Sequence, residues 1–593
     1  MKQIYNILSI AALVIAGVMT TGCVDQLNDP QQPQDGGKTV TLTTTVGLEG
    51  ATKALTAGGV KTFAAGDQIA VIYKNTSGQT KKVLSNALTG VGTDISTDGH
   101  YATFSAALTD AAAGGAVRYI YPAAMAKTTV ATDAVVNSDA ATVDFTNLDA
   151  QDGTLESLAA TLDLATYDGT LTSDAALPSG ITLSNQLCIL ELVLKSKQGS
   201  AVTKNITGLT ISDGTNTYTI TPSSLEKIYV AMQPVTSAQT LTFTASGYGT
   251  PLTKEVTGQT LEKNNLYPVN LTLTHLIDLS AIDVSDLPQN NGKKYYLVVD
   301  GDVLTGTLAE NYKISIADGA TVTLAGVSIN DGPGWTSGEY AGITCLGNAT
   351  INLAAGTENT VKGFASGWPG IYVPGNHDTS TYSTLTIQGS GTLNARGGSN
   401  APGMGGASDH DGGNIVIKNG TINATGKLGA GIGAGDYAHF GTITISGGTV
   451  TATARDDYGA GIGTSGYSVS CGNILIDGGT VIATGGDFGP GIGSGYQNCT
   501  CGNITIAATI ISVTAIKGAG TEKDDPCIGK GNNGHCGDIY FGNALVCYDD
   551  NTWYYGMPTS SGTYGGLYVT VSKTDGSYEN GWDTWTLTPP ATP

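Results

Sequence analysis

Apolar and polar residues alternate with a period of two through most of the chain, and in the second half this alternation recurs as a unit. The unit opens at Gly413, Gly441, Gly472, Gly502 and Gly537, at intervals of 28, 31, 30 and 35 residues. Each copy contains an alternating strand pattern, a turn, a second alternating pattern and a third short apolar piece. The apolar positions of the first strand are Ile415 and Ile417, Ile443 and Ile445, Ile474 and Ile476, and Ile504 and Ile506.

A fixed period of this kind is typical of a solenoid, because one repeat cannot bury its apolar face without a neighbour to stack on. Three strands and three turns in roughly 30 residues predict a parallel β-helix, in which each Ile stacks on its counterpart about 4.8 Å along the axis. Weaker copies lie upstream, at 383–395, 349–353 and 312–324. We therefore expect an all-β chain with a right-handed β-helix of about seven coils over residues 276–545.

The repeat is absent from both ends of the chain. Residues 38–275 contain short strand patterns separated by Gly, Asp, Asn and Ser turns, a spacing that predicts β-sandwiches. Residues 546–593 are rich in Trp and Tyr. Since a solenoid needs its open end covered, we expect this last segment to form an aromatic-rich cap.

Composition limits the partners of the protein. The chain has 593 residues, of which 13% are charged, and its net charge is -22. Such an acidic chain, without a run of basic residues, is poorly suited to bind nucleic acid or an anionic lipid surface. We therefore expect no nucleic-acid partner.

The N-terminus predicts secretion. Lys2 precedes an apolar run from Ile4 to Met19, so residues 1–22 fit a signal peptide and are too short for a retained membrane span. Gly22-Cys23 resembles the lipobox of bacterial lipoproteins, which implies a lipid on Cys23 that anchors the protein to the cell outer membrane. An unlipidated signal peptide is the alternative. The polar residues 23–37 are expected to form a flexible tether.

Five segments of the first half, in this order, carry a second resemblance. They are 63–73 (FAAGDQIAVIY), 119–122 (YIYP), 183–190 (LSNQLCIL), 228–234 (IYVAMQP) and 261–273 (LEKNNLYPVNLTL). Together with the lipobox they resemble the fimbrillin-like family, lipoprotein pilins of gut and oral gram-negative anaerobes. The resemblance implies tandem transthyretin-like β-sandwiches over residues 38–275, a place on the cell surface or in a fimbrium, and strand exchange with other fimbrillin subunits.

The same resemblance bears on assembly. A trypsin-like protease commonly cuts such proteins after a basic residue near the first strand, which here implies cleavage after Lys53; an uncut loop lysine is the alternative. More than 300 residues follow Thr274, so the last sandwich strand is poorly placed to be donated to another subunit. This predicts a fimbrial tip subunit that accepts a strand and gives none, or a monomeric surface lipoprotein.

Aromatic residues recur in the loops of the repeat. Tyr458 and Phe488 precede the third apolar piece of their coils, whereas Tyr437, Tyr467 and Tyr496 follow it. Rings in a surface ladder suit the apolar C–H faces of sugars, so we take these five residues as candidates for glycan binding. The alternative is that they only cover the corners of the coils. The recurring glycine-rich lines of 341–536 also resemble the β-helical carbohydrate-binding repeat domains of secreted bacterial proteins.

Catalysis is a weaker interpretation. Polysaccharide lyases and hydrolases with parallel β-helices need clustered Asp with Arg or Lys. The residues of this kind near one register are Arg396, Lys427, Arg455, Asp456, Asp457 and Asp487. The hydrolase pattern of Asp-Asp, Gly-His-Gly and Arg-Ile-Lys is not met, because His535 stands in Gly-His-Cys-Gly. We expect no enzyme; a lyase or hydrolase acting on extracellular glycans and a structural spacer are the alternatives.

Two smaller groups have candidate chemistry. Asp409 and Asp411 are candidate Ca²⁺ ligands, with solvated turn residues as the alternative, and no other cofactor is expected. Disulfides are predicted among six late cysteines, three of which directly precede the Gly that opens a coil; a metal site with His535 is the alternative. These six are Cys471, Cys499, Cys501, Cys527, Cys536 and Cys547. Cys188 and Cys345 lie in apolar strand patterns and are predicted to be buried thiols.

Taken together, the sequence predicts a lipid-anchored surface adhesin. Its fimbrillin-like half would lie on the membrane side and its β-helix would bind a glycan or a host surface.

Overall fold

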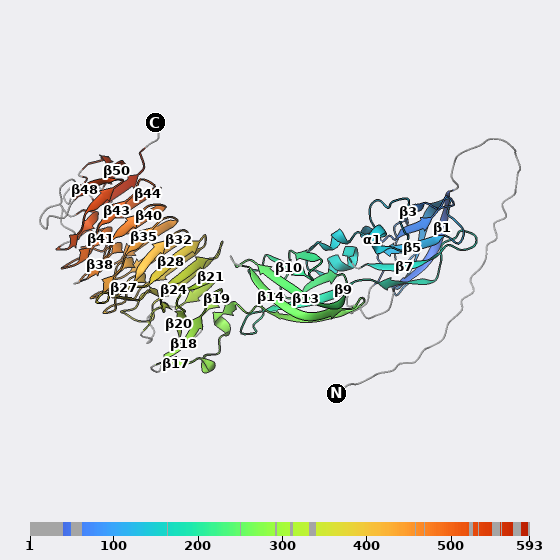
Figure 1. Ribbon diagram of the computed structural model, residues 1–593, viewed down its shortest axis with the longest axis horizontal. Helices are drawn as coiled ribbons and strands as arrows, with labels where there is room; N and C mark the ends of the chain where they lie inside the picture. The colour runs from blue at the N-terminus through green and yellow to red at the C-terminus, as the bar shows by residue number, and fades with distance from the viewer. Residues whose placement is uncertain are drawn as a thin grey trace.

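A computed structural model gives the fold of the protein. It describes residues 39–48, 62–162, 164–248, 251–290, 293–308, 312–330, 340–456, 458–467, 469–520, 526–531, 533–547, 558, 560–572 and 583–590. The predicted signal peptide, Cys23, the tether and Lys53 lie outside these residues. Strands dominate the described residues, which confirms the all-β class, and none of the described helices is long and apolar enough to cross a membrane. Figure 1 shows two β-sheet regions followed by a stack of coils.

The first region is a seven-stranded sheet in the order β3-β2-β5-β7-β8-β1-β4. Its strands are β1 (Thr39–Leu48), β2 (Ala70–Lys74), β3 (Thr80–Leu84), β4 (Tyr101–Thr109), β5 (Ala116–Tyr121), β7 (Ala165–Thr170) and β8 (Ile181–Asn185). β1 is antiparallel to β4, and its end runs parallel to β8. Val46, Phe104 and Tyr119 meet in one buried cluster, so strands far apart in the chain share this core.

The second region packs two sheets on each other, with strand orders β14-β13-β10-β11-β6 and β12-β9-β15. The strands are β6 (Ala150–Gln151), β9 (Cys188–Lys195), β10 (Gly208–Ser212), β11 (Thr217–Ile220), β12 (Ile228–Met232), β13 (Val235–Ser246), β14 (Leu252–Leu261) and β15 (Leu266–Thr272). Two short helices flank β6: α1 (Asp139–Thr142) comes before it and α2 (Leu155–Ser157) after it. Leu190 of β9 and Phe243 of β13 lie in the same core, as expected for a sandwich.

The C-terminal half is a parallel β-helix, and the strands of each coil pair with those of the next. The first ladder is β16 (Leu276–Asp278), β19 (Val303–Thr307), β21 (Ala320–Ile329), β23 (Ala349–Leu353), β28 (Thr384–Gly389), β31 (Asn414–Ile417), β35 (Ile443–Ile445), β39 (Ile474–Ile476), β43 (Ile504–Ile506) and β47 (Ile539–Phe541). Ile415, Ile443, Ile474 and Ile504 stand opposite one another along this ladder. These fully or almost fully buried columns form one continuous core.

The second ladder starts at the end of β21 and continues through β24 (Glu358–Lys362), β29 (Thr392–Arg396), β32 (Thr421–Gly426), β36 (Thr449–Ala454), β40 (Thr480–Thr484) and β44 (Ser512–Ile516). The third ladder is β18 (Lys293–Val298), β20 (Lys313–Ile316), β22 (Ile343–Cys345), β25 (Ile371–Tyr372), β30 (Met404–Gly405), β33 (Ile432–Gly433), β37 (Ile462–Gly463), β41 (Ile492–Ser494) and β45 (Ile528–Lys530). A short fourth ladder joins β34 (His439–Phe440), β38 (Ser470–Cys471), β42 (Thr500–Cys501) and β46 (His535–Cys536).

The β-helix has more coils than the sequence repeat suggests. Within the described residues the third ladder has nine parallel strands, β18 to β45, more than the about seven coils expected. The early coils bury Ile277, Leu304 and Ile314 in the same continuous core. The recognised copy at 312–324 covers Ile314, whereas no recognised copy covers β16, β18 and β19, which lie before it.

Each end of the β-helix is covered. At the C-terminal end, β50 (Leu567–Ser572) and β51 (Thr584–Thr588) form an antiparallel pair, and β51 also pairs with β44. Trp585 and Leu587 of β51 are buried there. At the other end, Leu276 and Val303 belong to the core of the second sandwich region, which therefore continues into the first coil.

Candidate functional site

Five aromatic side chains from neighbouring loops form one group, which we call the ring cluster: Tyr437, Tyr458, Tyr467, Phe488 and Tyr496. The rings of Tyr437 and Tyr467 stack with centroids 6.2 Å apart and planes at 12°. Those of Tyr458 and Phe488 stack at 5.8 Å and 17°. The Tyr496 ring lies 5.0 Å from Tyr458 and 5.5 Å from Phe488. The sequence indicated two columns, and the structure brings them together at one corner of the coils.

The ring cluster lies at the surface. The side chain of Tyr437 is 59% exposed, and the other four rings are half-buried. Hydrogen bonding to Tyr458 and burial raise the pKa of Tyr467, so its hydroxyl stays protonated at neutral pH. The cluster therefore presents both apolar ring area and neutral hydroxyl groups to solvent.

Glycines allow the loops to approach closely enough for these rings to touch. A Cβ on Gly466 would lie 2.4 Å from the Cβ of Tyr458, and one on Gly495 would lie 2.0 Å from the carbonyl oxygen of Ser465. Real Cβ atoms do not tolerate such separations. The glycine-rich lines of the repeat are thus needed by the coil and, at the same time, they bring the aromatic residues together.

A buried carboxylate lies beside the ring cluster. Asp436 is 5% exposed, and the backbone N–H of Gly466 donates a hydrogen bond to its carboxylate at 3.4 Å. Burial raises the pKa of Asp436. The next residue, Tyr437, has a φ of 56°, which is uncommon for a residue other than glycine. The turn at Asp436 therefore holds Tyr437 in a backbone conformation that its own sequence does not favour.

The aromatic surface extends upstream along the same edge of the β-helix. Backbone hydrogen bonds link Ser408 to Gly367 at 2.8 Å, Asp409 to Asp436 at 2.9 Å, and Tyr437 to Tyr467 at 3.4 Å. On these upstream loops the rings of Trp368 and His410 lie 5.1 Å apart, and those of Trp368 and Tyr372 lie 5.6 Å apart. We call Trp368, His410 and the ring cluster together the aromatic edge.

Sequence reasoning missed Trp368, Tyr372 and His410. They stand in upstream coils whose loops differ in length from the later ones, so their positions do not repeat at a fixed interval. The sequence signal that could have placed these residues near the ring cluster was the order of the loops along the chain. Only the stacked coils show which loops share an edge.

The two candidate calcium ligands, Asp409 and Asp411, lie in hydrogen-bonded loops. The carboxylate of Asp411 accepts hydrogen bonds from the backbone N–H of His377 at 2.8 Å and of His439 at 2.9 Å. The rings of these two histidines stack 3.9 Å apart. Asp409 is exposed, and Ser408 donates to its carboxylate at 3.3 Å. In the part of the chain that is described, no three His, Cys, Asp or Glu residues gather to hold a metal ion. The structure thus assigns Asp411 to bonding between loops.

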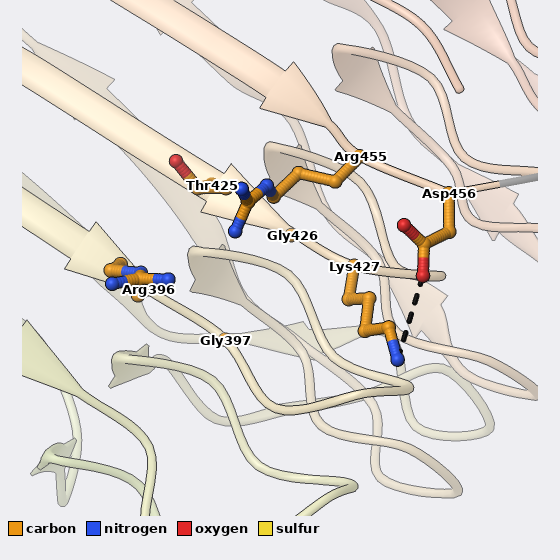
Figure 2. Close-up of a pocket in the computed structure, with 7 residues that line it drawn as sticks. All are labelled: Arg396, Gly397, Thr425, Gly426, Lys427, Arg455 and Asp456. Atoms are coloured by element: carbon orange, nitrogen blue, oxygen red, sulfur yellow. Dashed lines mark ion pairs between the residues drawn. The ribbon is translucent and has the colours of Figure 1, made fainter. Parts of the chain in front are cut away.

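A pocket of about 260 Å³ lies where the second strands of successive coils end. It is lined by Arg396, Gly397, Thr425, Gly426, Lys427, Arg455 and Asp456. Figure 2 shows the Arg455 side chain reaching back over the strand of Thr425, while Lys427 points to Asp456. The Nζ of Lys427 lies 3.5 Å from the Asp456 carboxylate. Of the other predicted acidic residues, Asp487 is exposed and does not line the pocket, and Asp457 lies outside the described residues.

The late cysteines form the expected column but no disulfide. Cys471, Cys501 and Cys536 stand opposite one another in the fourth ladder, and the Sγ atoms of Cys471 and Cys501 are 3.2 Å apart. A disulfide needs Cβ atoms about 3.8 Å apart, whereas parallel strands in register hold them near 4.8 Å. Within the described residues, the buried cysteines that form no disulfide are Cys188, Cys345, Cys471, Cys499, Cys501, Cys527, Cys536 and Cys547. This corrects the predicted disulfides and agrees with the prediction for Cys188 and Cys345.

Comparison with protein families found one match. The chain matches the Beta helix repeat family over residues 385–408, 415–436, 443–467 and 474–496. These segments include every member of the ring cluster except Tyr437, and all seven residues that line the pocket. A comparison with curated proteins found no match for this sequence.

Solved structures with some similarity are known from Bacteroides. A candidate cell adhesion protein of Bacteroides fragilis is 12% identical, with 39% of this chain and 92% of that chain covered and a TM-score of 0.24. A fimbrial protein of Bacteroides ovatus is 11% identical, with 39% and 48% covered and a TM-score of 0.24. A candidate cell adhesion protein of Bacteroides uniformis is 15% identical, with 41% and 94% covered and a TM-score of 0.24. Values this low support no inference about function.

Proposed function

We propose that this protein is a surface adhesin whose β-helix binds a glycan along the aromatic edge without chemical conversion. The observation that carries the proposal is the exposed ring of Tyr437, stacked on Tyr467 and continued by half-buried rings on neighbouring loops. Solvent-facing aromatic rings with hydroxyl groups beside them suit the alternating apolar and polar faces of sugars. Successive coils repeat about every 4.8 Å, so the edge offers an extended surface for a chain of sugar units.

Two alternatives have less support. A structural spacer needs no exposed ring such as Tyr437, which is 59% exposed. Most glycoside hydrolases use two carboxylates, whereas among the described residues that line the pocket Asp456 is the one carboxylate, and Lys427 lies 3.5 Å from it. We therefore propose binding without turnover.

The test is a glycan array probed with the protein produced without residues 1–23. We expect binding that falls at least about tenfold in the triple variant Tyr437→Ala, Tyr467→Ala, Tyr496→Ala, because truncating a central aromatic contact costs about 2 kcal/mol or more. The control is Tyr568→Ala, which removes another exposed ring, 44% exposed, from the C-terminal cap. Equal loss in both variants, or no bound glycan at all, would reject the proposal. Release of shorter saccharides during the assay would favour the enzyme instead.

We also propose that the protein is lipid-anchored through Cys23 at the cell outer membrane, and that its sandwich accepts a strand from another fimbrillin subunit. β1 lies between β4 and β8, so its removal after a cut at Lys53 would open a gap between two strands. β15 continues directly into β16 of the β-helix, which leaves it no free end to donate. Trypsin should release the segment before Lys53 from the folded protein but not from a Lys53→Ala variant. Lipid labelling should require Cys23.

A further inference from the structure

We infer that the glycan is acidic, and that the pocket of Arg396, Lys427 and Arg455 binds its carboxylate or sulfate group. This inference rests on the proposed glycan binding and adds the chemical class of the ligand. Arginine is rare in this chain and is concentrated in the pocket. The chain contains three arginines, and two of them line this one pocket.

The third arginine shows how this protein treats a guanidinium group that serves structure alone. Arg118 is 3% exposed and forms ion pairs with Asp139 and with Asp168, the latter at 3.3 Å. By contrast, the guanidinium groups of Arg396 and Arg455 are exposed, and neither has an ion pair or hydrogen bond within the described part of the chain. Two of the three arginines are thus left available for a ligand.

Parallel stacking brings the cations together. Arg396 ends β29 opposite Thr425 of β32, and the backbone N–H of Arg455 bonds to the carbonyl of Gly426 at 3.2 Å. Lys427 follows Gly426 directly, so the three cations come from three successive coils about 4.8 Å apart. Figure 2 shows Arg396, Lys427 and Arg455 around the same hollow.

The charge of the pocket is opposite to that of the protein. Three cations and one carboxylate line it, which leaves two positive charges in a chain whose net charge is -22. Like charges on adjacent coils repel one another, and an anion between them removes that repulsion. A guanidinium group also matches the two oxygens of a carboxylate or sulfate through paired hydrogen bonds. The net negative charge of the chain repels polyanions. An acidic glycan is therefore selected only by a specific local contact of this kind.

The pocket and the ring cluster meet on one loop. Arg455 lies on the loop between β36 and β37, three residues before Tyr458 of the ring cluster. One saccharide that rests on the rings therefore has a cationic pocket that begins on the loop of Tyr458. The two sites have separate roles, since the rings bind the sugar faces and the pocket reads the charge.

The experiment uses the protein produced without residues 1–23 and an array that includes neutral, uronic-acid and sulfated glycans. We expect the double variant Arg396→Gln, Arg455→Gln to weaken acidic glycans by about tenfold or more, with neutral glycans and thermal stability unchanged. The control Lys204→Gln, Lys418→Gln removes the same charge from two exposed lysines elsewhere and should bind as the wild type does. Added salt should weaken the wild type more than the arginine variant.

Each outcome has a distinct meaning. Binding of uronic-acid or of sulfated members alone identifies the anionic group. Equal binding by the wild type and the arginine variant, or a preference for neutral glycans, overturns the inference but leaves the proposed function intact if the tyrosine variant still loses binding. An equal loss in the lysine control also overturns it, because net charge alone would then explain the effect. If no glycan binds the wild type, the proposed function fails and the inference fails with it.

Discussion

The two halves of this molecule build buried β-structure in different ways. In the first sandwich region Val46 of β1 stands beside Ile181 of β8, so the core depends on pairing between distant parts of the chain. In the β-helix each strand pairs with the strand one coil further on, as Ile443 pairs with Ile474. Each region of the first half therefore has one shared core, whereas the β-helix is a row of nearest-neighbour contacts.

Two glycines, one from each half, illustrate this difference in packing. In the sandwich, Gly78 sits in a turn with a φ of 74°, and a Cβ there would meet nothing within 4 Å. In the β-helix, Gly463 has a φ of 137°, and a Cβ there would lie 1.9 Å from the carbonyl oxygen of Gly493. At these two positions the β-helix uses glycine for the close stacking of coils, and the sandwich half uses it for the direction of a turn.

The largest expected effect tests this contrast directly. Gly463→Ala should lower the free energy of unfolding by more than about 4 kcal/mol, because the new methyl group overlaps the next coil. Gly78→Ala should lower it by only about 1–2 kcal/mol, the ordinary penalty of a left-handed alanine. Denaturant unfolding of both variants measures the two values, and similar losses would contradict the distinction.

Truncating a buried side chain should lower the free energy of unfolding by a similar amount in both halves. The region that is destabilised should differ in extent. Ile445 and Leu190 are both fully buried, and replacing either by Ala should cost about 2–5 kcal/mol. Hydrogen exchange should show faster exchange in Ile445→Ala mainly at the adjacent strands β31 and β39. In Leu190→Ala, exchange should rise across both sheets of the second sandwich. An effect of Ile445→Ala that is uniform along the β-helix would show that its coils do not act as neighbours.

The junction between the second sandwich region and the first coil of the β-helix determines whether the two halves unfold together. Asp302 is fully buried, 3.1 Å from His275 and 3.9 Å from Lys197, and it accepts the backbone N–H of Val299 at 3.0 Å. Asp302→Asn should cost about 1–3 kcal/mol and separate the thermal transitions of sandwich and β-helix.

The control for this junction variant is Asp456→Asn, which breaks the more exposed pair with Lys427. Its cost should stay below about 1 kcal/mol, because surface ion pairs contribute little. Calorimetry that shows one unchanged transition for Asp302→Asn would indicate that the shared apolar core alone couples the halves.

The smallest expected effect is the pH dependence of stability that Asp436 causes. Burial raises the pKa of Asp436 in the folded state, so the folded chain binds this proton more readily than the unfolded chain. Stability relative to an Asp436→Asn variant should therefore rise as the pH falls from neutral toward about 4, where the unfolded carboxyl also becomes protonated. Melting temperatures of both proteins across this range measure the effect, and a wild type whose melting temperature stays constant or falls relative to the Asn variant in acid would contradict it.

Much of the β-helix could be predicted because its contacts repeat in sequence. The alternation of Ile415 and Ile417 and its recurrence at Ile443 and Ile445 identify the strands, the buried face and the register before any coordinates are known. No copy of the repeat was recognised before Tyr312, although Ile277 and Leu304 lie in the same continuous core. The predicted disulfides failed for a geometric reason, because a column of cysteines in register is close in Cα but too wide in Cβ.

The sequence by itself determined the strands, the stacking period and the composition of the candidate site. These properties are local or repeat at a fixed interval, so each residue specifies its own neighbours. Only the tertiary structure decided that the two aromatic columns meet in one ring cluster, that Trp368 and His410 extend it, and that Arg396 and Arg455 line one pocket. Side chains on different loops meet through the path of those loops around a corner, and residue spacing does not encode that path.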